Sequence, residues 1–240
     1  MSVSAIDFAA FAREHIRLNA HSSVRLEAAA VNGAPRVIYV DPFLMDAEHN
    51  VPTPPHDADL ICFTHSHYDH FSPKDAAAAA RTDGTTRYVM PASMVAEALA
   101  AGVAEDAITE VEPGRVVHPL GVPLRAVTAY NATKQFHPKA NRWVGYVIQA
   151  RPAVSVYVCG DTDANPDCFA VDCDIMCLPV GGTYTMNAPE AAALVNSMFL
   201  AKERPAVAIP THYGSAVGKA EDGPAFAGLV DEGVHVILPY

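Results

Sequence analysis

Four residues able to bind a metal ion lie within one six-residue segment, His65-Ser-His67-Tyr-Asp69-His70. The segment directly follows the apolar run 60–63, so it begins where a buried strand is predicted to end. Neutral imidazole and carboxylate groups bind Zn²⁺ and similar divalent ions. A solvated, His-rich loop is the alternative, but the position directly after a core strand favours a metal site.

Two further ligand-type residues follow predicted strands later in the chain. Asp161 and His212 each come after an apolar run rich in β-branched residues. Because α/β proteins gather their chemistry where strands end, three strand ends could point into one cleft. Asp41 also follows such a run, and we expect it and His21 to orient metal ligands through hydrogen bonds. Plain structural hydrogen bonding is the alternative for both.

The elements that must position these residues are short strands interrupted by a few helices. Helices are predicted at residues 5–15, 72–80, 92–101 and 189–200. Strands are predicted at 24–31, 36–40, 60–63, 87–90, 122–130, 144–149, 155–159, 175–180, 206–209 and 234–238. Since strands and helices do not alternate strictly, packed sheets with helices outside are favoured over a doubly wound sheet. No shift in composition marks a boundary, so one domain over residues 1–240 is expected.

These segments together resemble the signature of the metallo-β-lactamase fold. The central segment matches the family's His-x-His-x-Asp-His motif, and the resemblance extends over about residues 17–215. The other matching segments are Asn19-Ala-His21-Ser-Ser23, Tyr39-Val-Asp41-Pro-Phe43, Cys159-Gly160-Asp161-Thr162-Asp163 and Ile209-Pro-Thr-His212-Tyr-Gly214. The first of them is similar to an element of the L-ascorbate-6-phosphate lactonase-like branch.

The resemblance implies an α/β fold, a four-layer αββα sandwich in which two sheets face each other between outer helices. It also implies two metal ions at the seam between two related halves, with Zn²⁺ as the expected ion and Mn²⁺ as an alternative. The implied ligands are His65, His67 and His137 for one ion, Asp69, His70 and His212 for the other, and Asp161 as the bridge.

One position departs from the family pattern. Most members supply a third histidine at the strand end where this chain has Asn131, and His137 follows six residues later. A neutral amide oxygen is a weak ligand beside imidazole, so His137 is taken as the ligand. The alternative is that His137 lies at the rim and one ion is loosely held or absent.

The resemblance implies a metal-dependent hydrolase, because a bound ion lowers the pKa of water towards about 7 and so provides hydroxide at neutral pH. The expected substrate is a small, anionic molecule with a lactone or phosphodiester bond. If only one ion binds, Asp69 is the expected general base. A phospholipase-D-like phosphodiesterase and an inactive metal-binding scaffold or sensor are the alternatives.

Substrate contacts are predicted from three residues. Lys134 belongs to a small basic group with Lys139 and Arg142 that could receive a phosphate or carboxylate. Tyr184 lies in a Gly-containing turn before a predicted helix and could reach the pocket mouth, and Asn131 lies at the centre itself. An ordinary solvated loop and an ordinary turn are the alternatives.

Composition narrows the class of protein. The chain of 240 residues is 50% hydrophobic and carries a formal net charge of −11, without the basic stripe expected of a nucleic-acid binder. No apolar run approaches the roughly 20 residues that a membrane helix needs. The N-terminal segment lacks a secretory pattern, and five cysteines within or near apolar runs suggest reduced thiols, so a cytoplasmic location is expected. The oligomeric state stays open, a homo-oligomer included.

Overall fold

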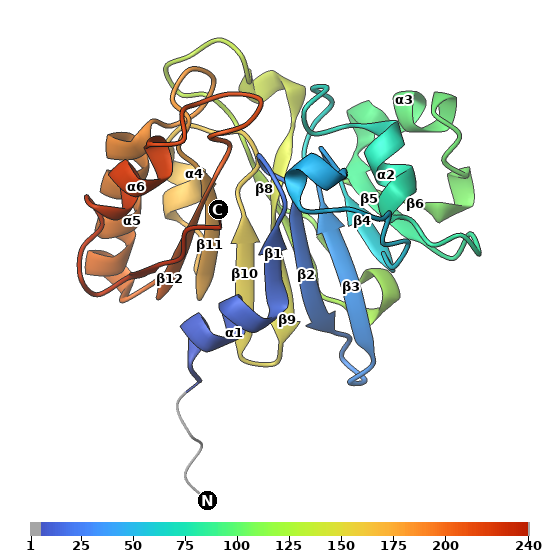
Figure 1. Ribbon diagram of the computed structural model, residues 1–240, viewed down its shortest axis with the longest axis horizontal. Helices are drawn as coiled ribbons and strands as arrows, with labels where there is room; N and C mark the ends of the chain where they lie inside the picture. The colour runs from blue at the N-terminus through green and yellow to red at the C-terminus, as the bar shows by residue number, and fades with distance from the viewer. Residues whose placement is uncertain (1–5, 240) are drawn as a thin grey trace, which may run out of the picture.

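The computed structural model describes residues 6–239. Its strands form two sheets that stand face to face in the middle of the molecule, and helices cover both outer sides (Figure 1). The α/β sandwich expected from the sequence is therefore confirmed. Within the described residues, no helix combines the length and the apolar character needed to cross a membrane.

The first sheet has six strands in the spatial order β1-β2-β3-β4-β5-β6. β1, β2 and β3 pair antiparallel, whereas β3 to β6 pair parallel. Their bounds are β1 Ile16–Leu18, β2 Val24–Ala29, β3 Pro35–Val40, β4 Leu60–Cys62, β5 Arg87–Pro91 and β6 Ile108–Val111.

The second sheet has seven strands in the order β13-β12-β11-β10-β9-β8-β7. It repeats the plan of the first, because β7 to β10 pair antiparallel and β10 to β13 pair parallel. Their bounds are β7 Val116–Val117, β8 Leu124–Thr128, β9 Val144–Arg151, β10 Val154–Val158, β11 Ile175–Pro179, β12 Val207–Thr211 and β13 His235–Val236.

The helices pack on the outer faces, with α2 and α3 on the first sheet and α4, α5 and α6 on the second (Figure 1). The α-helices are α1 Phe8–His15, α2 Pro73–Ala79, α3 Val95–Ala100, α4 Pro166–Phe169, α5 Ala188–Lys202 and α6 Asp222–Ala227. Short 3₁₀ turns are Ala47–His49, Ala92–Met94, Glu105–Ala107, Pro119–Gly121 and Lys139–Asn141.

Alternation along the strands divides the core into layers. In β3, Ile38 and Val40 face the other sheet, while Tyr39 faces the helices. In β11, Ile175 faces inward and Met176 packs under the helices. This period of two is what a strand buried on both faces requires. All five cysteines are buried and unpaired in the described residues, with Cys62 and Cys159 in the apolar runs where they were expected.

The predicted elements agree with the structure where they are long and apolar. The main omissions are β1, β6 and β7, and α4 and α6, none of them longer than six residues. The strand predicted at 234–238 shortens to the two residues of β13. The helix predicted at 5–15 is observed as α1, and residue 5 lies outside the described range.

Candidate metal centre

The candidate ligands lie in loops that directly follow strand ends of both sheets. Asp41 follows β3, His65 follows β4, Asp161 follows β10 and His212 follows β12. These strands end at the same edge of the sandwich, so their loops meet there. His21, Asp41 and His212 hold left-handed backbone conformations, with φ of 52°, 48° and 58°. Such conformations cost about 1–3 kcal/mol each and are typical of functional sites.

One group of ligand atoms belongs to His65, His67, His137 and Asp161. All four atoms lie within 4.8 Å of one another. His65 Nε2 lies 3.1 Å from His67 Nδ1, and His137 Nε2 lies 3.2 Å from Asp161 Oδ2. The group joins residues from both sheets, with His65 and His67 from the first and His137 and Asp161 from the second.

A second group comprises His21, Asp69, His70 and His212, whose ligand atoms also lie within 4.8 Å of one another. His21 Nε2 lies 3.1 Å from Asp69 Oδ2, and His212 Nε2 lies 3.8 Å from the same oxygen. All four side chains are nearly or fully buried. The contact with Asp69 fits the orienting role expected of His21, but its place among the ligand atoms was not predicted.

Asp161 lies between the two groups. Its Oδ2 is 3.0 Å from His212 Nε2 and 3.2 Å from His137 Nε2, and its Oδ1 is 3.1 Å from His70 Nε2. One carboxylate therefore contacts histidines of both groups, which is the arrangement that the bridging role requires.

Hydrogen bonds behind the site fix which ring nitrogen points inward. Asp41 Oδ2 accepts from His70 Nδ1 at 2.7 Å and from the Thr64 hydroxyl at 2.5 Å. Because that hydroxyl donates to Asp41, it accepts from His65 Nδ1 at 2.9 Å. His65 and His70 are thus held with Nε2 facing the centre. A hydrogen bond from the other ring nitrogen is the usual way in which proteins orient metal-binding imidazoles.

Several inward-facing atoms are buried and make no well-aligned hydrogen bond among the described residues, although the imidazole nitrogens lie 3.0–3.2 Å from the Asp161 carboxylate. These atoms are His70 Nε2, His137 Nε2, His212 Nε2 and Asp161 Oδ1. Neutral imidazole nitrogens and a carboxylate oxygen converging in this way form the donor set that a divalent ion such as Zn²⁺ takes, so the residues present fit the metal.

The pKa values of several residues at the site are shifted from their ordinary values. Burial alone would raise the pKa of Asp161, but His212 and His70 outweigh it and hold that pKa well below its usual range. Burial opposes protonation of His70, yet Asp161 and Asp41 raise its pKa well above the ordinary value. Burial lowers the pKa of His65 and of His67. Without metal, a proton on His70 therefore supplies positive charge that the carboxylates attract.

Asp69 and His21 form a further polarised pair. Burial would raise the pKa of Asp69, but the hydrogen bond from His21 and the charge of His70 lower it to about 2. Burial lowers the pKa of His21 to about 4. A general base works best when its pKa lies near the working pH, so a carboxylate this acidic suits metal binding better than proton abstraction.

A pocket of about 380 Å³ opens beside both groups, because its lining includes His67 and Asp161 of the first and Asp69 of the second. Aromatic and apolar side chains form most of its wall, and the lining contains no Lys or Arg. The lining residues are His67, Tyr68, Asp69, Phe136, Asp161, Tyr184, Ala216 and Val217. The rings of Phe136 and Tyr184 meet edge to face with centroids 4.8 Å apart.

Of the three residues predicted to contact substrate, only Tyr184 lines this pocket. Asn131 lies behind His137 and outside the pocket lining, and His137 takes the place in the ligand group. The Lys134 ammonium is held by Asp163 at 2.9 Å and by Glu190 at 3.4 Å, so its positive charge is already matched by carboxylates.

Phe136 and Asp163 are among the residues at the site that had no role in the sequence analysis. Phe136 gave no signal except its position beside His137. Asp163 stands two residues after Asp161 in the motif that the family resemblance singled out, and that spacing could have indicated it.

Comparison with known proteins places the chain in a family. The model of the beta-lactamase superfamily domain matches residues 15–212. A UPF0173 metal-dependent hydrolase of Thermoplasma acidophilum is 31% identical over 210 residues, covering 84% of this chain and 87% of the relative. Another from Methanopyrus kandleri is 28% identical over 221 residues, covering 88% and 89%.

Solved structures agree. A crystal structure named as a metal-dependent hydrolase from Parabacteroides distasonis has a TM-score of 0.70 and 28% identity, covering 93% of this chain and 91% of that one. Igni18, a metallo hydrolase of Ignicoccus hospitalis, shares the fold with a TM-score of 0.67 at 20% identity, covering 93% and 94%. The chain therefore belongs to the metallo-β-lactamase superfamily and, within it, to the UPF0173 metal-dependent hydrolase family.

Proposed function

We propose that the protein is a metal-dependent hydrolase that holds two divalent ions in the two ligand groups. The observation that carries this proposal is the convergence of three buried imidazole nitrogens, those of His70, His137 and His212, within 3.2 Å of the Asp161 carboxylate. The names of the relatives support the reaction type. The ions would supply Lewis acidity, which lowers the pKa of water and polarises a substrate oxygen.

The protein's own residues divide the remaining work. One ion would be held by His65, His67 and His137, the other by Asp69, His70 and His212, with Asp161 shared; His21 is a further candidate ligand on the side of Asp69. Asp41 keeps the His70 imidazole oriented, and Thr64 does the same for His65. Asp69 acts in this scheme as a ligand, because its low pKa makes it a weak base.

Zn²⁺ is the proposed ion and Mn²⁺ the alternative. Histidine-rich donor sets favour Zn²⁺, whereas carboxylate oxygens also accept Mn²⁺. With His137 in the ligand group, the departure at Asn131 no longer argues for an inactive scaffold. The scaffold therefore becomes the less favoured function.

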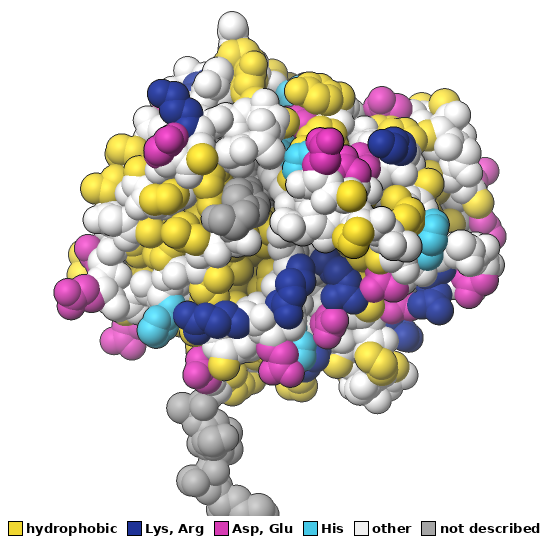
Figure 2. Space-filling model, in the orientation of Figure 1, with side chains coloured by type: hydrophobic (Ala, Val, Ile, Leu, Met, Phe, Trp, Pro, Cys, Tyr) yellow, Lys and Arg dark blue, Asp and Glu magenta, His cyan; other side chains and the backbone are white. Residues whose placement is uncertain are grey.

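The proposed substrate is a small molecule with a lactone or phosphodiester bond. The ions would receive its negative charge, because the pocket lining contains no Lys or Arg. The aromatic wall suits an apolar or aromatic part of the substrate. A small substrate, rather than nucleic acid, is favoured by the net charge of −11 and by the face in Figure 2, where Lys and Arg lie among Asp and Glu. Membership in the ascorbate-6-phosphate lactonase-like branch stays a prediction.

The test is to count metal and measure hydrolysis in the same preparation. Protein loaded with Zn²⁺ or Mn²⁺ should hold two equivalents and should hydrolyse a simple lactone or bis(p-nitrophenyl) phosphate. The variant His65→Ala/His67→Ala should lose one equivalent and the activity. One equivalent in the unmodified protein, with no turnover in either metal, would instead support the scaffold or sensor.

A further inference from the structure

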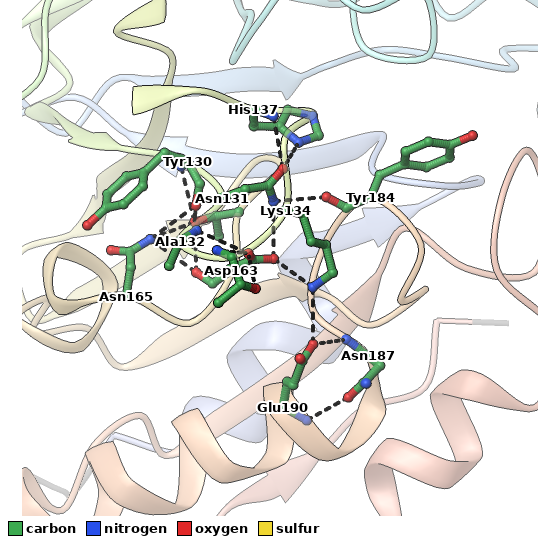
Figure 3. A network of polar contacts seen from close by, with 12 residues as sticks. Tyr130, Asn131, Ala132, Lys134, His137, Asp163, Asn165, Tyr184, Asn187 and Glu190 are labelled. Carbon is green, nitrogen blue, oxygen red and sulfur yellow. Dashed lines mark hydrogen bonds and ion pairs between the residues drawn. The ribbon is translucent and has the colours of Figure 1, made fainter. Parts of the chain in front are cut away.

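The loop between Asn131 and His137 is closed on itself by its two end residues. The backbone N–H of Asn131 donates to the carbonyl of His137 at 2.8 Å, and the backbone N–H of His137 donates to Asn131 Oδ1 at 2.9 Å. The same Oδ1 lies 3.1 Å from His137 Nδ1 (Figure 3). Asn131 is buried, so these contacts are shielded from water.

The orientation of the Asn131 amide is determined by its other side. Nδ2 donates to Asp163 Oδ1 at 3.1 Å and to the Tyr184 carbonyl at 2.9 Å. Both partners are acceptors, so the NH₂ group must face them and the carbonyl oxygen must face His137. Because an amide oxygen only accepts, His137 Nδ1 must carry its proton. The lone pair of Nε2 is then directed at the centre, 3.2 Å from Asp161 Oδ2.

Asp163 is in turn held from several directions. Its Oδ2 accepts from the backbone N–H groups of Ala132 and Thr133 at 3.1 and 3.2 Å, and its Oδ1 pairs with Lys134 Nζ at 2.9 Å. The lysine also contacts Glu190, whose side chain caps the first turn of α5 (Figure 3). The carboxylate therefore ties the loop to the second sheet and to α5.

We propose that Asn131 is a positioning residue that selects the tautomer and fixes the orientation of His137, with Asp163 holding the Asn131 amide in place. The proposal rests on the proposed function, because it assigns a purpose to Nε2 of His137. It explains how the chain keeps a histidine ligand although Asn131 stands where the family resemblance leads us to expect histidine. Tyr184 shares the network, so one amide also ties the ligand loop to a wall of the pocket.

The first experiment measures metal binding in the variant Asn131→Ala. We expect the affinity for one of the two metal ions to fall by about 10–100-fold, which is the usual effect of losing a residue that orients a metal-bound histidine. Titration with Co²⁺, followed by its visible absorption, should show one altered site and one unchanged site. Two unchanged sites would overturn the inference and leave the proposed function intact, whereas absence of metal from the unmodified protein would overturn both.

A double-mutant cycle separates positioning from a general loss of packing. Asn131→Asp keeps the acceptor for His137 but places a carboxylate against Asp163. In Asp163→Asn the backbone N–H groups of Ala132 and Thr133 hold the amide oxygen, so its NH₂ group faces the Asn131 amide, donor against donor. The double variant restores a donor and an acceptor between the two positions. We expect each single change to weaken the altered Co²⁺ site and the pair to recover part of the loss. Additive losses would contradict the proposed link between the two residues.

Lys134 and Lys139 provide a matched control within the same loop. Both ammonium groups pair with a carboxylate, but Lys139 pairs with Asp167 at 2.8 Å on the exposed surface. Lys134→Met should weaken the same site that Asn131→Ala weakens, by a smaller factor, since the backbone N–H groups still hold Asp163. Lys139→Met should leave both sites as they are. Equal effects of the two changes would argue against the network.

Discussion

Three of the candidate histidine ligands are each oriented by a different kind of acceptor. A hydroxyl accepts from His65, a carboxylate from His70 and a carboxamide from His137. All three leave Nε2 towards the centre and place the second ring nitrogen in a hydrogen bond. The shared result suggests that orientation of the imidazole, rather than the identity of the acceptor, is what the site requires.

At Asp161, a change of charge without a change of size tests the bridging role. Asp161→Asn replaces one carboxylate oxygen that faces the histidines with an NH₂ group, which cannot bind metal, and it removes the negative charge that attracts the ions. We expect the affinity for both metal ions to fall at least tenfold and hydrolysis to be lost. Metal analysis and an activity assay measure the two effects. Asp167→Asn, at the Lys139 ion pair, should change neither. Full metal content in Asp161→Asn would remove Asp161 from the bridge.

The sequence predicted the ligand cluster but not the surroundings of every member. Ligand-type residues after apolar runs were visible in the sequence because local spacing placed them there. The partner of Lys134 was not, because Glu190 lies 56 residues away and approaches only when α5 packs on the sheet. The choice between Asn131 and His137 likewise depended on how one loop closes, which spacing alone does not determine.

Among the elements, two loops at the site approach each other at a glycine. A Cβ built on Gly181, just after β11, would lie 2.1 Å from the carbonyl oxygen of His212, just after β12. A backbone carbonyl cannot move away from such a contact as easily as the end of a flexible side chain can. The absence of a side chain at Gly181 therefore lets the His212 loop reach its place in the second group.

Gly181→Ala should displace His212. We expect a loss of about 1–3 kcal/mol in the free energy of unfolding, as for other overpacked positions, and weaker binding of one metal ion. Urea unfolding and metal titration measure the two effects. Gly228→Ala is the control, because its added Cβ would meet atoms no closer than 3.6 Å at an ordinary φ. A Gly181→Ala protein with unchanged metal affinity would show that the His212 loop is not constrained there.

The sequence predicted the interior strands better than the edges of the sheets. Strands such as β10 and β11 are buried along their whole length, so their composition is strongly constrained. β6 is half exposed and β7 and β13 have two residues each, so few side chains reveal them. Long apolar runs carry their own signal, whereas edge strands form because a neighbour offers unpaired backbone groups.

At the scale of the molecule, the two sheets are joined by apolar packing and by a buried hydrogen bond. The Tyr146 hydroxyl, from β9 in the second sheet, donates to the Phe63 carbonyl just after β4 at 2.6 Å. That carbonyl lies two residues before His65. The contact therefore connects the half that supplies Asp161 and His212 with the half that supplies the histidine cluster.

Removing this hydroxyl should weaken the joint between the sheets. Tyr146→Phe leaves the Phe63 carbonyl without its best partner, and we expect a loss of about 1–3 kcal/mol in the free energy of unfolding. The control is Tyr88→Phe, because the Tyr88 hydroxyl has no hydrogen-bond partner among residues 6–239. Denaturant unfolding of both variants measures this loss. Equal losses of unfolding free energy in the two variants would assign the effect to ring packing instead of the hydrogen bond.

The buried histidines make the metal-free fold sensitive to acid. Burial lowers the pKa of His21 to about 4 from an ordinary 6.5, and it also lowers the pKa of His65 and His67. Between about pH 6.5 and 4 the unfolded chain therefore binds more protons, so stability falls as the pH falls. His70 acts in the opposite direction, because its raised pKa adds stability below pH 6.5 that is lost as the pH rises through the folded value.

A variant of His21 tests how much the neutral, buried histidines contribute to this pH dependence of stability. The pKa shift of His21 corresponds to at most about 3 kcal/mol of stability at neutral pH that disappears by about pH 4. In metal-free protein, urea unfolding at pH 7.5, 6 and 5 should give decreasing stability, and His21→Gln should flatten that dependence because no neutral imidazole remains to be protonated. His235→Gln, at an exposed histidine, should keep the slope of the unmodified protein. An unchanged slope in His21→Gln would mean that its imidazole is not held neutral by burial in the folded state.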